Sequence, residues 1–355
     1  MTRVLIVEDS ATMRGHLREA LAPDPQLEVI GEAVDGLRAV EMTARLRPDV
    51  ITMDMMLPGI SGLAATEQIM AEYPTPILVV SSADRQELFS TYNALAAGAV
   101  DVLEKPRGDD SDADWSQRLR ATLRMVARIR VITHPRARLD GRLDRRWADP
   151  VPVAAPAPLT ETLSVVAVGA STGGPAALTE LLRELPPNFR TPILCVQHIA
   201  ASEQFAVAFS DWLAGQTGRN VQYARDGTPI SRSAGQVLLA PPDRHLYVRD
   251  HLLRLSDGPP RHSCRPAVDV LFESVAIEFG SAAAGCLLTG MGRDGASGLL
   301  QMRSRGALTF AQDEASCTVY GMPREAALLG AAAYVLPPSR IAAHLADLHP
   351  AGVRR

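Results

Sequence analysis

The sequence lacks any long run of uncharged apolar residues, and no stretch approaches the roughly 20 that span a bilayer. Its four cysteines are scattered and none forms a Cys-x-x-Cys pair, which argues against a disulfide framework or a zinc site of that type. The net charge of −4 shows no basic excess, so the composition does not predict nucleic acid binding. The N-terminus reaches Glu8 and Asp9 at once, unlike a signal peptide. We therefore expect a soluble cytoplasmic protein with no membrane insertion.

The chain is long enough for two or three domains, and its composition is that of an ordinary globular protein. A proline-rich stretch, 149–158, is typical of an extended linker. We predict a first domain over residues 1–125, a linker over 126–160 and a second domain over 161–349.

The first domain alternates short apolar runs with segments of helical spacing. Such an alternation predicts a doubly wound α/β domain with a parallel sheet covered on both faces. The predicted strands are 4–7, 27–33, 49–53, 77–80 and 99–103, and the clearest predicted helices are 11–21 and 37–46.

Polar residues follow four of these predicted strands: Glu8 with Asp9, then Asp54, Ser81 and Lys105. Ligands bind at the carboxyl edge of such sheets. Carboxylates that crowd together repel one another unless a cation neutralises them, and oxygen ligands of this kind suit Mg²⁺. The alternative is that these are ordinary solvated loop acids, which the complete set in this order disfavours.

This part of the chain resembles a response-regulator receiver domain of the flavodoxin-like type. The resemblance is carried by Glu8-Asp9, Asp54 with Pro58 and Gly62, Ser81, and Lys105-Pro106. It implies that Asp54 accepts a phosphoryl group from a cognate histidine kinase. It also implies that Glu8, Asp9 and Asp54 hold Mg²⁺, while Ser81 and Lys105 contact the phosphoryl oxygens. Val102 stands where many receivers carry an aromatic switch residue, so the relay of the signal departs from that pattern.

The second domain opens with an apolar run that ends in Gly169-Ala-Ser-Thr-Gly173, followed by Pro175. Proline suits the first turn of a helix, so Ser171 is predicted on a tight turn between a strand and a helix. The spelling Gly-x-Ser-x-Gly is that of a nucleophile elbow. A glycine-rich turn that binds phosphate at a helix N-terminus is the alternative.

His198 and Asp294 also follow predicted strands, 192–196 and 282–289, and the domain is therefore predicted to hold a second parallel sheet. A serine hydroxyl needs a base to take its proton, and an imidazole base needs a carboxylate to orient it. Ser171, His198 and Asp294 supply these three roles. His245 competes for the role of base. The backbone N–H of Met291 is the candidate oxyanion donor, with Thr172 as a second polar contact.

The whole chain resembles the protein-glutamate methylesterase family of chemotaxis-type response regulators. The motifs that carry this resemblance are Gly169–Gly174, Gln197-His198, Cys264–Phe272, Thr289–Gly295, and Ala311–Ser316 with Tyr320–Pro323. The resemblance implies that Ser171 attacks a glutamate γ-methyl ester on the signalling domain of a methylated chemoreceptor, with no cofactor for the ester chemistry. Deamidation of receptor glutamines is the family's related activity.

The resemblance further implies that the unphosphorylated receiver restrains the esterase. Two other readings stay open at this point. One is a non-enzymatic two-component adapter, and the other is a nucleotide-binding output domain. Gln197-His198 stands where an acidic residue would contact a ribose, which counts against the second.

Overall fold

The computed structural model describes residues 1–82, 84–106, 112–129, 131, 163–199 and 203–348, and it divides the chain into two compact units, Met1–Arg145 and Arg146–Arg355. Most of the predicted linker, 132–160, lies outside the described residues. Each unit is described by itself below.

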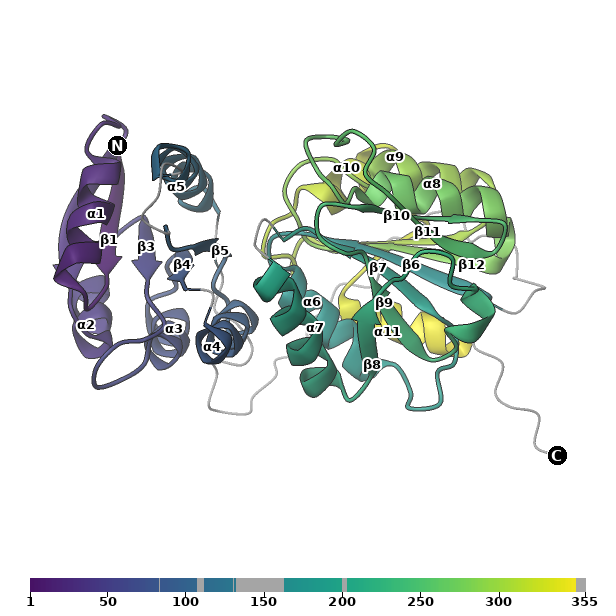
Figure 1. The fold of residues 1–355 in the computed structure, drawn as a ribbon, viewed down its shortest axis with the longest axis horizontal. Coiled ribbons are helices and arrows are strands. Elements are labelled where there is room, and N and C mark those ends of the chain that lie inside the picture. The colour runs from purple at the N-terminus through teal and green to yellow at the C-terminus, as the bar shows by residue number, and fades with distance from the viewer. Residues whose placement is uncertain (83, 107–111, 130, 132–162, 200–202, 349–355) are drawn as a thin grey trace. The chain divides into compact units, whose positions relative to one another are not determined.

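The first unit is built on a parallel sheet of five strands in the order β2-β1-β3-β4-β5. Its strands are β1 (Thr2–Val7), β2 (Leu27–Ala33), β3 (Val50–Met53), β4 (Ile77–Ser81) and β5 (Asp101–Glu104). Its helices are α1 (Ala11–Leu21), α2 (Gly36–Leu46), α3 (Gly62–Glu72), α4 (Arg85–Ala96) and α5 (Asp112–Val126). Figure 1 shows α1 and α5 over one face of the sheet and α2, α3 and α4 over the other.

Three helices of the first unit, α1, α2 and α3, begin at side chains that cap them. Ser10, Asp35 and Ser61 each accept a hydrogen bond from a backbone N–H in the first turn of α1, α2 and α3. Such caps satisfy donors that a helix leaves unpaired at its start. The apolar stripe of α5 is buried in the core: Trp115, Leu119, Leu123 and Val126. The predicted receiver architecture is thus observed.

The second unit is built on a parallel sheet of seven strands in the order β14-β13-β12-β6-β7-β9-β8. Its strands are β6 (Val165–Ala170), β7 (Ile193–Gln197), β8 (Asn220–Tyr223), β9 (Gln236–Leu239), β12 (Ala283–Leu287), β13 (Leu308–Gln312) and β14 (Tyr334–Leu336). All five residues of β7 and of β12 are buried, as expected for strands covered on both faces.

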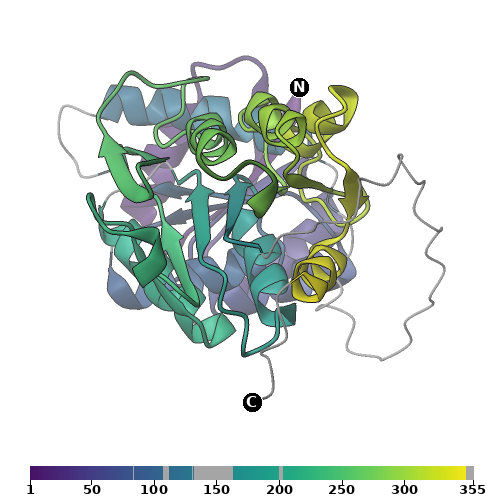
Figure 2. The same cartoon turned by 90° about the vertical axis from the view of Figure 1, so that its right-hand side faces the viewer.

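Helices cover both faces of this second sheet. They are α6 (Gly174–Glu184), α7 (Glu203–Thr217), α8 (Val268–Phe279), α9 (Ala296–Ser304), α10 (Met322–Leu328) and α11 (Pro338–Asp347), with short 3₁₀ turns at Ile230–Arg232 and Gly280–Ala282. Figures 1 and 2 show α8 and α9 over one face, and α6, α7 and α11 over the other.

An antiparallel hairpin, β10 (His245–Arg249) with β11 (Leu252–Ser256), forms a separate small sheet in the second unit. The βα alternation of the sequence does not predict it. Leu246, Val248 and Leu253 of the hairpin pack into the core that also holds residues of α8. The hairpin therefore covers part of the layer formed by α8 and α9.

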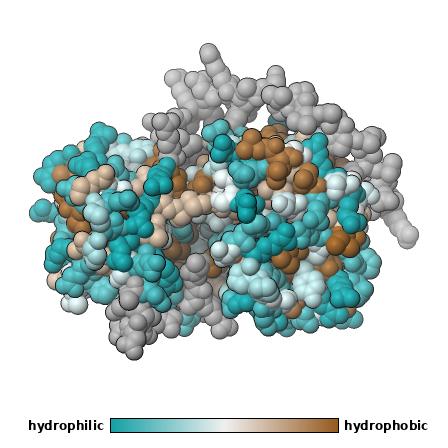
Figure 3. All heavy atoms as spheres, turned by 90° about the horizontal axis from the view of Figure 1, so that it is seen from above, coloured by the Kyte–Doolittle hydropathy of each residue, from teal (hydrophilic) through white to brown (hydrophobic). Residues whose placement is uncertain are grey.

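None of the described helices is both long enough and apolar enough to cross a bilayer. On the face shown in Figure 3, hydrophobic residues form separate small groups among hydrophilic ones. Large exposed apolar side chains such as Ile277 on α8 and Leu300 on α9 lie on the outer helices. Scattered apolar side chains of this kind are ordinary on protein surfaces.

Candidate active site

Ser171, His198 and Asp294 follow three neighbouring strands of the seven-stranded sheet. Strand β6 lies between β12 and β7, with Gly169 paired to Leu287 and Ala170 paired to Gln197. Ser171 and His198 are the next residues along their strands. Because neighbouring parallel strands lie about 4.8 Å apart, these two residues are adjacent at the carboxyl edge. Asp294 lies in the loop that leaves β12 at the same edge.

His198 and Asp294 are joined directly. His198 Nε2 lies 3.0 Å from Asp294 Oδ2, and the side chains are 14% and 3% exposed. A hydrogen bond in so buried a place fixes the plane of the imidazole ring. The pair therefore has the geometry of a base and the carboxylate that orients it.

The Asp294 carboxylate is held in turn by the start of α8. The backbone N–H groups of Val268 and Asp269 donate to Asp294 Oδ2 and Oδ1, at 2.7 and 3.0 Å. A helix N-terminus carries unpaired donors and a partial positive charge, and both favour an ionised carboxylate there. The residues of this helix start belong to the motif Cys264–Phe272, to which sequence reasoning gave no separate role.

These contacts shift the pKa values of both partners. Burial disfavours the charged imidazole, but the hydrogen bond to Asp294 and the contact with Cys264 outweigh it and raise the pKa of His198 to about 9. Burial also opposes the charge on Asp294, but the hydrogen bonds from His198 and from backbone N–H groups hold the pKa of that carboxyl below its ordinary value. The site thus stabilises the charge that a general base acquires when it takes a proton.

Ser171 sits on the tight turn that its sequence predicts. Its N–H donates to the Thr289 carbonyl at 3.0 Å, and its carbonyl accepts from Gln197 Nε2 at 2.9 Å. Gly173 continues the turn with a φ of 77°, which glycine adopts without strain. A Cβ added at Gly290 would lie 2.7 Å from Ser171 Cβ, so only glycine allows this loop so close to the serine.

The two candidate oxyanion groups flank the same turn. Met291 follows Gly290, and its side chain is 43% exposed. Thr172 is buried, and its carbonyl accepts a hydrogen bond from Thr289 Oγ1 at 3.0 Å, which ties the turn to the end of β12. Their roles as oxyanion donors stay predictions.

The second ring nitrogen of His198 faces a cysteine. His198 Nδ1 lies 3.9 Å from Cys264 Sγ, and among the contacts of residues 163–199 and 203–348 none joins Ser171 Oγ to the imidazole. Sequence reasoning gave Cys264 no function. The contact depends on a chain reversal around Cys264 that the apolar pattern does not reveal.

His245, the competing candidate base, has a structural role, because both of its ring nitrogens contact the backbone. It is 4% exposed, its Nε2 lies 3.1 Å from the Pro259 carbonyl, and its Nδ1 accepts the Ala267 N–H at 3.1 Å. Both nitrogens are therefore occupied by the backbone. His245 supports the segment that leads into α8.

The first unit brings three acidic residues together at the carboxyl edge of the five-stranded sheet, Glu8, Asp9 and Asp54. Lys105 Nζ lies 3.0 Å from Glu8 Oε2 and 3.0 Å from Asp54 Oδ2. One carboxylate oxygen each from Glu8, Asp9 and Asp54 lies within 4.8 Å of the others. These oxygens match the donors that Mg²⁺ prefers.

One lysine does not balance this acidic group. Burial is the main cause that raises the pKa of Glu8 and that of Asp54. Burial lowers the pKa of Lys105, but the two carboxylates outweigh it and raise that pKa. A divalent cation would supply the missing positive charge, so the residues present fit a bound Mg²⁺.

Ser81, the predicted phosphoryl contact, is buried at the end of β4. Its Oγ lies 2.7 Å from Thr91 Oγ1 on α4. The role of Ser81 toward a phosphoryl group stays a prediction, as does the consequence of Val102 at the switch position.

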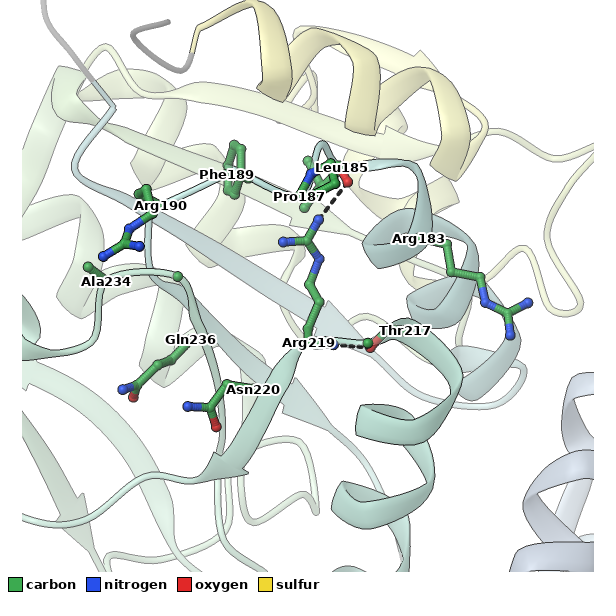
Figure 4. Close-up of a pocket in the computed structure, with 12 residues that line it drawn as sticks. Arg183, Leu185, Pro187, Phe189, Arg190, Thr217, Arg219, Asn220, Ala234 and Gln236 are labelled. Carbon is green, nitrogen blue, oxygen red and sulfur yellow. Dashed lines mark hydrogen bonds between the residues drawn. The ribbon is translucent and has the colours of Figure 1, made fainter. Parts of the chain in front are cut away.

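A cavity of about 430 Å³ lies at the edge of the seven-stranded sheet where the strands begin, opposite the carboxyl edge (Figure 4). Its lining includes Asn220 and Gln236, which begin β8 and β9. Arg219 donates to the Leu185 carbonyl at 2.6 Å and thus supports the loop around it. The cavity is therefore separate from the edge that carries Ser171.

The chain matches known proteins over both units. Residues 166–345 match the CheB methylesterase family, and residues 4–112 match the response regulator receiver domain. The protein-glutamate methylesterase/protein-glutamine glutaminase 2 of Anaeromyxobacter dehalogenans (strain 2CP-C) is 43% identical over 98% of this chain and 96% of that protein. The protein-glutamate methylesterase/protein-glutamine glutaminase 3 of the same strain is 45% identical over 98% of both. The crystal structure of the Thermotoga maritima CheB methylesterase catalytic domain is similar with a TM-score of 0.49 and 33% identity, over 53% of this chain and 100% of that one.

A receiver domain followed by a methylesterase domain defines a class, the response regulators whose output domain is a hydrolase. The two units described above have the architecture that this class requires. The chain belongs to the CheB methylesterase family. The adapter and nucleotide-binding alternatives are not favoured by this membership.

Proposed function

We propose that the protein hydrolyses glutamate γ-methyl esters on the signalling domain of a methylated chemoreceptor, with Ser171, His198 and Asp294 as its catalytic residues. The observation that carries the proposal is the 3.0 Å contact between His198 and Asp294 at the edge where Ser171 follows the neighbouring strand. The names of the relatives, protein-glutamate methylesterase/protein-glutamine glutaminase, support the substrate class.

In this mechanism His198 takes the proton of Ser171 Oγ as the oxygen attacks the ester carbonyl. The tetrahedral intermediate collapses when the imidazolium returns the proton to the methoxy oxygen, and methanol leaves. Water, activated by the same imidazole, then releases the glutamate and restores Ser171. The Asp294 carboxylate stabilises the imidazolium in both steps.

The hydrogen bond between Ser171 and His198 forms in this mechanism when substrate binds. Catalytic hydrogen bonds are often long or poorly aligned in the free enzyme and tighten in the complex. The Met291 N–H stabilises the developing oxyanion, with Thr172 as a further polar contact. The substrate ester can come close to Ser171 because Gly290 has no side chain beside it.

Deamidation of a receptor glutamine follows the same course in this proposal. Ser171 attacks the side-chain amide, and ammonia leaves in place of methanol. The acyl-enzyme and its hydrolysis are then identical. Ammonia release from a receptor that carries glutamine at the methylation sites is the measurement that tests this second activity.

The direct test of the proposed function uses a receptor labelled on its methyl esters. We expect labelled methanol to be released by the full chain, and faster when a phosphodonor and Mg²⁺ are present. A receptor whose sites carry unmethylated glutamate is the control. Absence of release in both conditions, from a receptor whose methyl esters another methylesterase removes, would refute the proposal.

We further propose that a cognate histidine kinase phosphorylates Asp54. Bound Mg²⁺ would neutralise charge on the transferring phosphoryl group, and Glu8 and Asp9 would hold it with Asp54. Lys105 already contacts the Asp54 carboxylate and would move to the phosphoryl oxygens. The Ser81 hydroxyl would give up its hydrogen bond with Thr91 Oγ1 and contact the same phosphoryl oxygens.

Replacing Asp54 with asparagine should abolish phosphate incorporation, because an amide is not a nucleophile toward the phosphodonor. The measurement is acid-labile phosphate bound to the protein after incubation with the donor and Mg²⁺. Asp35→Asn is the matched control, since asparagine also caps a helix and Asp35 caps α2. Equal incorporation in Asp54→Asn and wild type would place the phosphorylated residue elsewhere.

Deleting residues 1–150 should raise basal esterase activity about fivefold or more, if the unphosphorylated receiver restrains the second unit by a typical coupling energy. Methanol release from the truncated and full chains at equal concentration measures this. Phosphodonor should stimulate the full chain and leave the truncated chain unchanged. A truncated chain that folds yet works no faster than the full chain would remove the case for restraint.

A further inference from the structure

A second pair of an imidazole and a carboxylate, His262 with Asp269, lies beside the catalytic pair, His198 with Asp294. His262 Nε2 lies 3.0 Å from Asp269 Oδ2, and the catalytic pair has the same separation of 3.0 Å. The Asp269 side chain is fully buried, and one of its oxygens lies within 4.8 Å of an oxygen of Asp294. The hydrolysis proposed above leaves the second pair without a role.

The carboxylates of the two pairs cap the starts of two neighbouring helices. The N-cap residues themselves, Ala267 for α8 and Gly295 for α9, make no side-chain hydrogen bond there. Asp294, which directly precedes the N-cap of α9, accepts the first two N–H groups of α8. Asp269, in the first turn of α8, accepts the Gly298 N–H in the first turn of α9 at 2.7 Å. Each helix start is thus capped by a carboxylate that belongs to the other.

This exchange of caps requires the two helix starts to lie very close together. A Cβ added at Gly298 would lie 2.7 Å from Phe272 Cβ and 3.1 Å from Asp269 Oδ1, so a larger residue there would push the helices apart. Movement of either helix start would change the aim of the α8 N–H groups at Asp294. The orientation of the His198 ring therefore depends on how firmly Asp269 joins α8 to α9.

We propose that His262 and Asp269 are positioning residues of the esterase, which lock the start of α8 against α9 and so hold Asp294 where it orients the His198 ring. The effect on turnover rests on the proposed function, whereas the effect on His198 can be measured without catalysis. His262 fixes one oxygen of the Asp269 carboxyl, and the other oxygen caps α9. Without the His262 donor, this carboxyl is free to rotate away from the Gly298 N–H.

The charges around Asp269 make the His262 contact important. Burial raises the pKa of Asp269, and the charge of Asp294 adds to this rise. The Gly298 N–H, His262 and Arg261 act in the opposite direction. Arg261 Nη2 lies 3.7 Å from Asp269 Oδ2, beyond hydrogen-bonding distance, so His262 is the side chain that holds this oxygen.

A strained turn brings His262 to the second pair. His262 and Ser263 have φ values of 51° and 62°, in the left-handed region that residues other than glycine rarely adopt. Two backbone hydrogen bonds between Arg261 and Cys264, of 3.0 and 2.9 Å, close this turn. The same turn places the Cys264 thiol beside the imidazole of the catalytic pair. Strain of this kind persists where the surrounding contacts hold it, and it is common at functional sites.

Loss of the His262 donor should lower the pKa of His198. Burial lowers that pKa, and the two titratable groups that face the ring, Asp294 and Cys264, raise it. If Asp294 binds the imidazolium about tenfold less tightly, the pKa of His198 falls by about one unit. The rate at high pH, where the imidazole is already unprotonated, should fall about tenfold for the same reason. At low pH the larger fraction of free base compensates for this loss, so the rate there should change little.

The variant that tests the proposal is His262→Asn in the full chain. Asparagine tolerates the left-handed backbone conformation, but its side chain is too short to reach Asp269. His262→Gln keeps an N–H donor near the position of Nε2 and should restore the behaviour of the wild type. His251→Asn is the matched control. His251 also has a positive φ, of 56°, and its Nδ1 lies 3.5 Å from the carboxylate of Glu278 near the other end of α8.

Two measurements are compared across these variants. NMR of the full chain with isotope-labelled histidine gives the pKa of His198, whose signal is assigned by its loss in His198→Gln. The kcat/KM for methanol release, from about pH 6 to pH 10, gives the pH profile. We expect His262→Asn to lower the His198 pKa by about one unit and the rate at high pH about tenfold. His262→Gln and His251→Asn should match the wild type in both measurements.

An unchanged His198 pKa in His262→Asn would overturn the proposal. A rate that falls by the same factor at every pH would also overturn it, since general loss of structure has that effect. So would a His262→Gln chain that behaves like His262→Asn, because the hydrogen bond would then not be the cause. A wild-type chain that releases no methanol would instead refute the proposed function, and the titration of His198 would still decide whether the second pair acts on the first.

Discussion

Replacing Ser171 with alanine should lower methanol release from a methylated chemoreceptor by about 10⁴-fold or more. Losing the nucleophile of a catalytic triad removes the covalent route, and the remaining groups supply only residual catalysis. The substitution deletes one oxygen and keeps the backbone contact of residue 171 with the Thr289 carbonyl. The fold should therefore persist, and Asp54 should still accept a phosphoryl group.

The matched control for this variant is Ser304→Ala. Ser304 is exposed at the end of α9, and its hydroxyl donates only to the Gln301 carbonyl of its own helix. We expect activity close to that of the wild type. Turnover by Ser171→Ala within tenfold of wild type, on the same receptor, would contradict the assignment of Ser171 as nucleophile.

Replacing Asp294 with asparagine should lower the turnover rate by about 10⁴-fold, the loss seen when the Asp of a triad becomes Asn. The carboxylate accepts from His198 and from two backbone N–H groups of α8. An amide has one oxygen in place of two, so its NH₂ group must face either His198 together with the Val268 N–H, or the Asp269 N–H. Either orientation costs a hydrogen bond, and the charge that stabilises the imidazolium is lost as well.

Asp347→Asn is the control for that change, because Asp347 is exposed at the end of α11. Methanol release gives the rate, and circular dichroism on heating separates loss of catalysis from loss of folding. If the two asparagine variants were equally active, Asp294 would have no part in the reaction. A folded but inactive Asp294→Asn chain is the expected result.

Local sequence patterns were sufficient to predict most of the helices and strands of the first unit. Helix α1 occupies the predicted residues 11–21, and β2 occupies the predicted 27–33. These elements follow from apolar spacing and from caps such as Ser10, which act over a few residues. The second unit was predicted less completely, because β10 and β11 pair antiparallel in a region that βα alternation does not describe.

The sequence by itself determined the alternation of strands and helices, the turn at Ser171, and the placement of His198 and Asp294 after separate strands. It left His198 and His245 as competing bases. Only the tertiary structure decided that His198 meets Asp294, that α8 holds the carboxylate, and that Cys264 faces the imidazole. The physical reason is that these contacts join residues far apart in the chain. They depend on the order β12-β6-β7 and on packing across the sheet, which local periodicity does not encode.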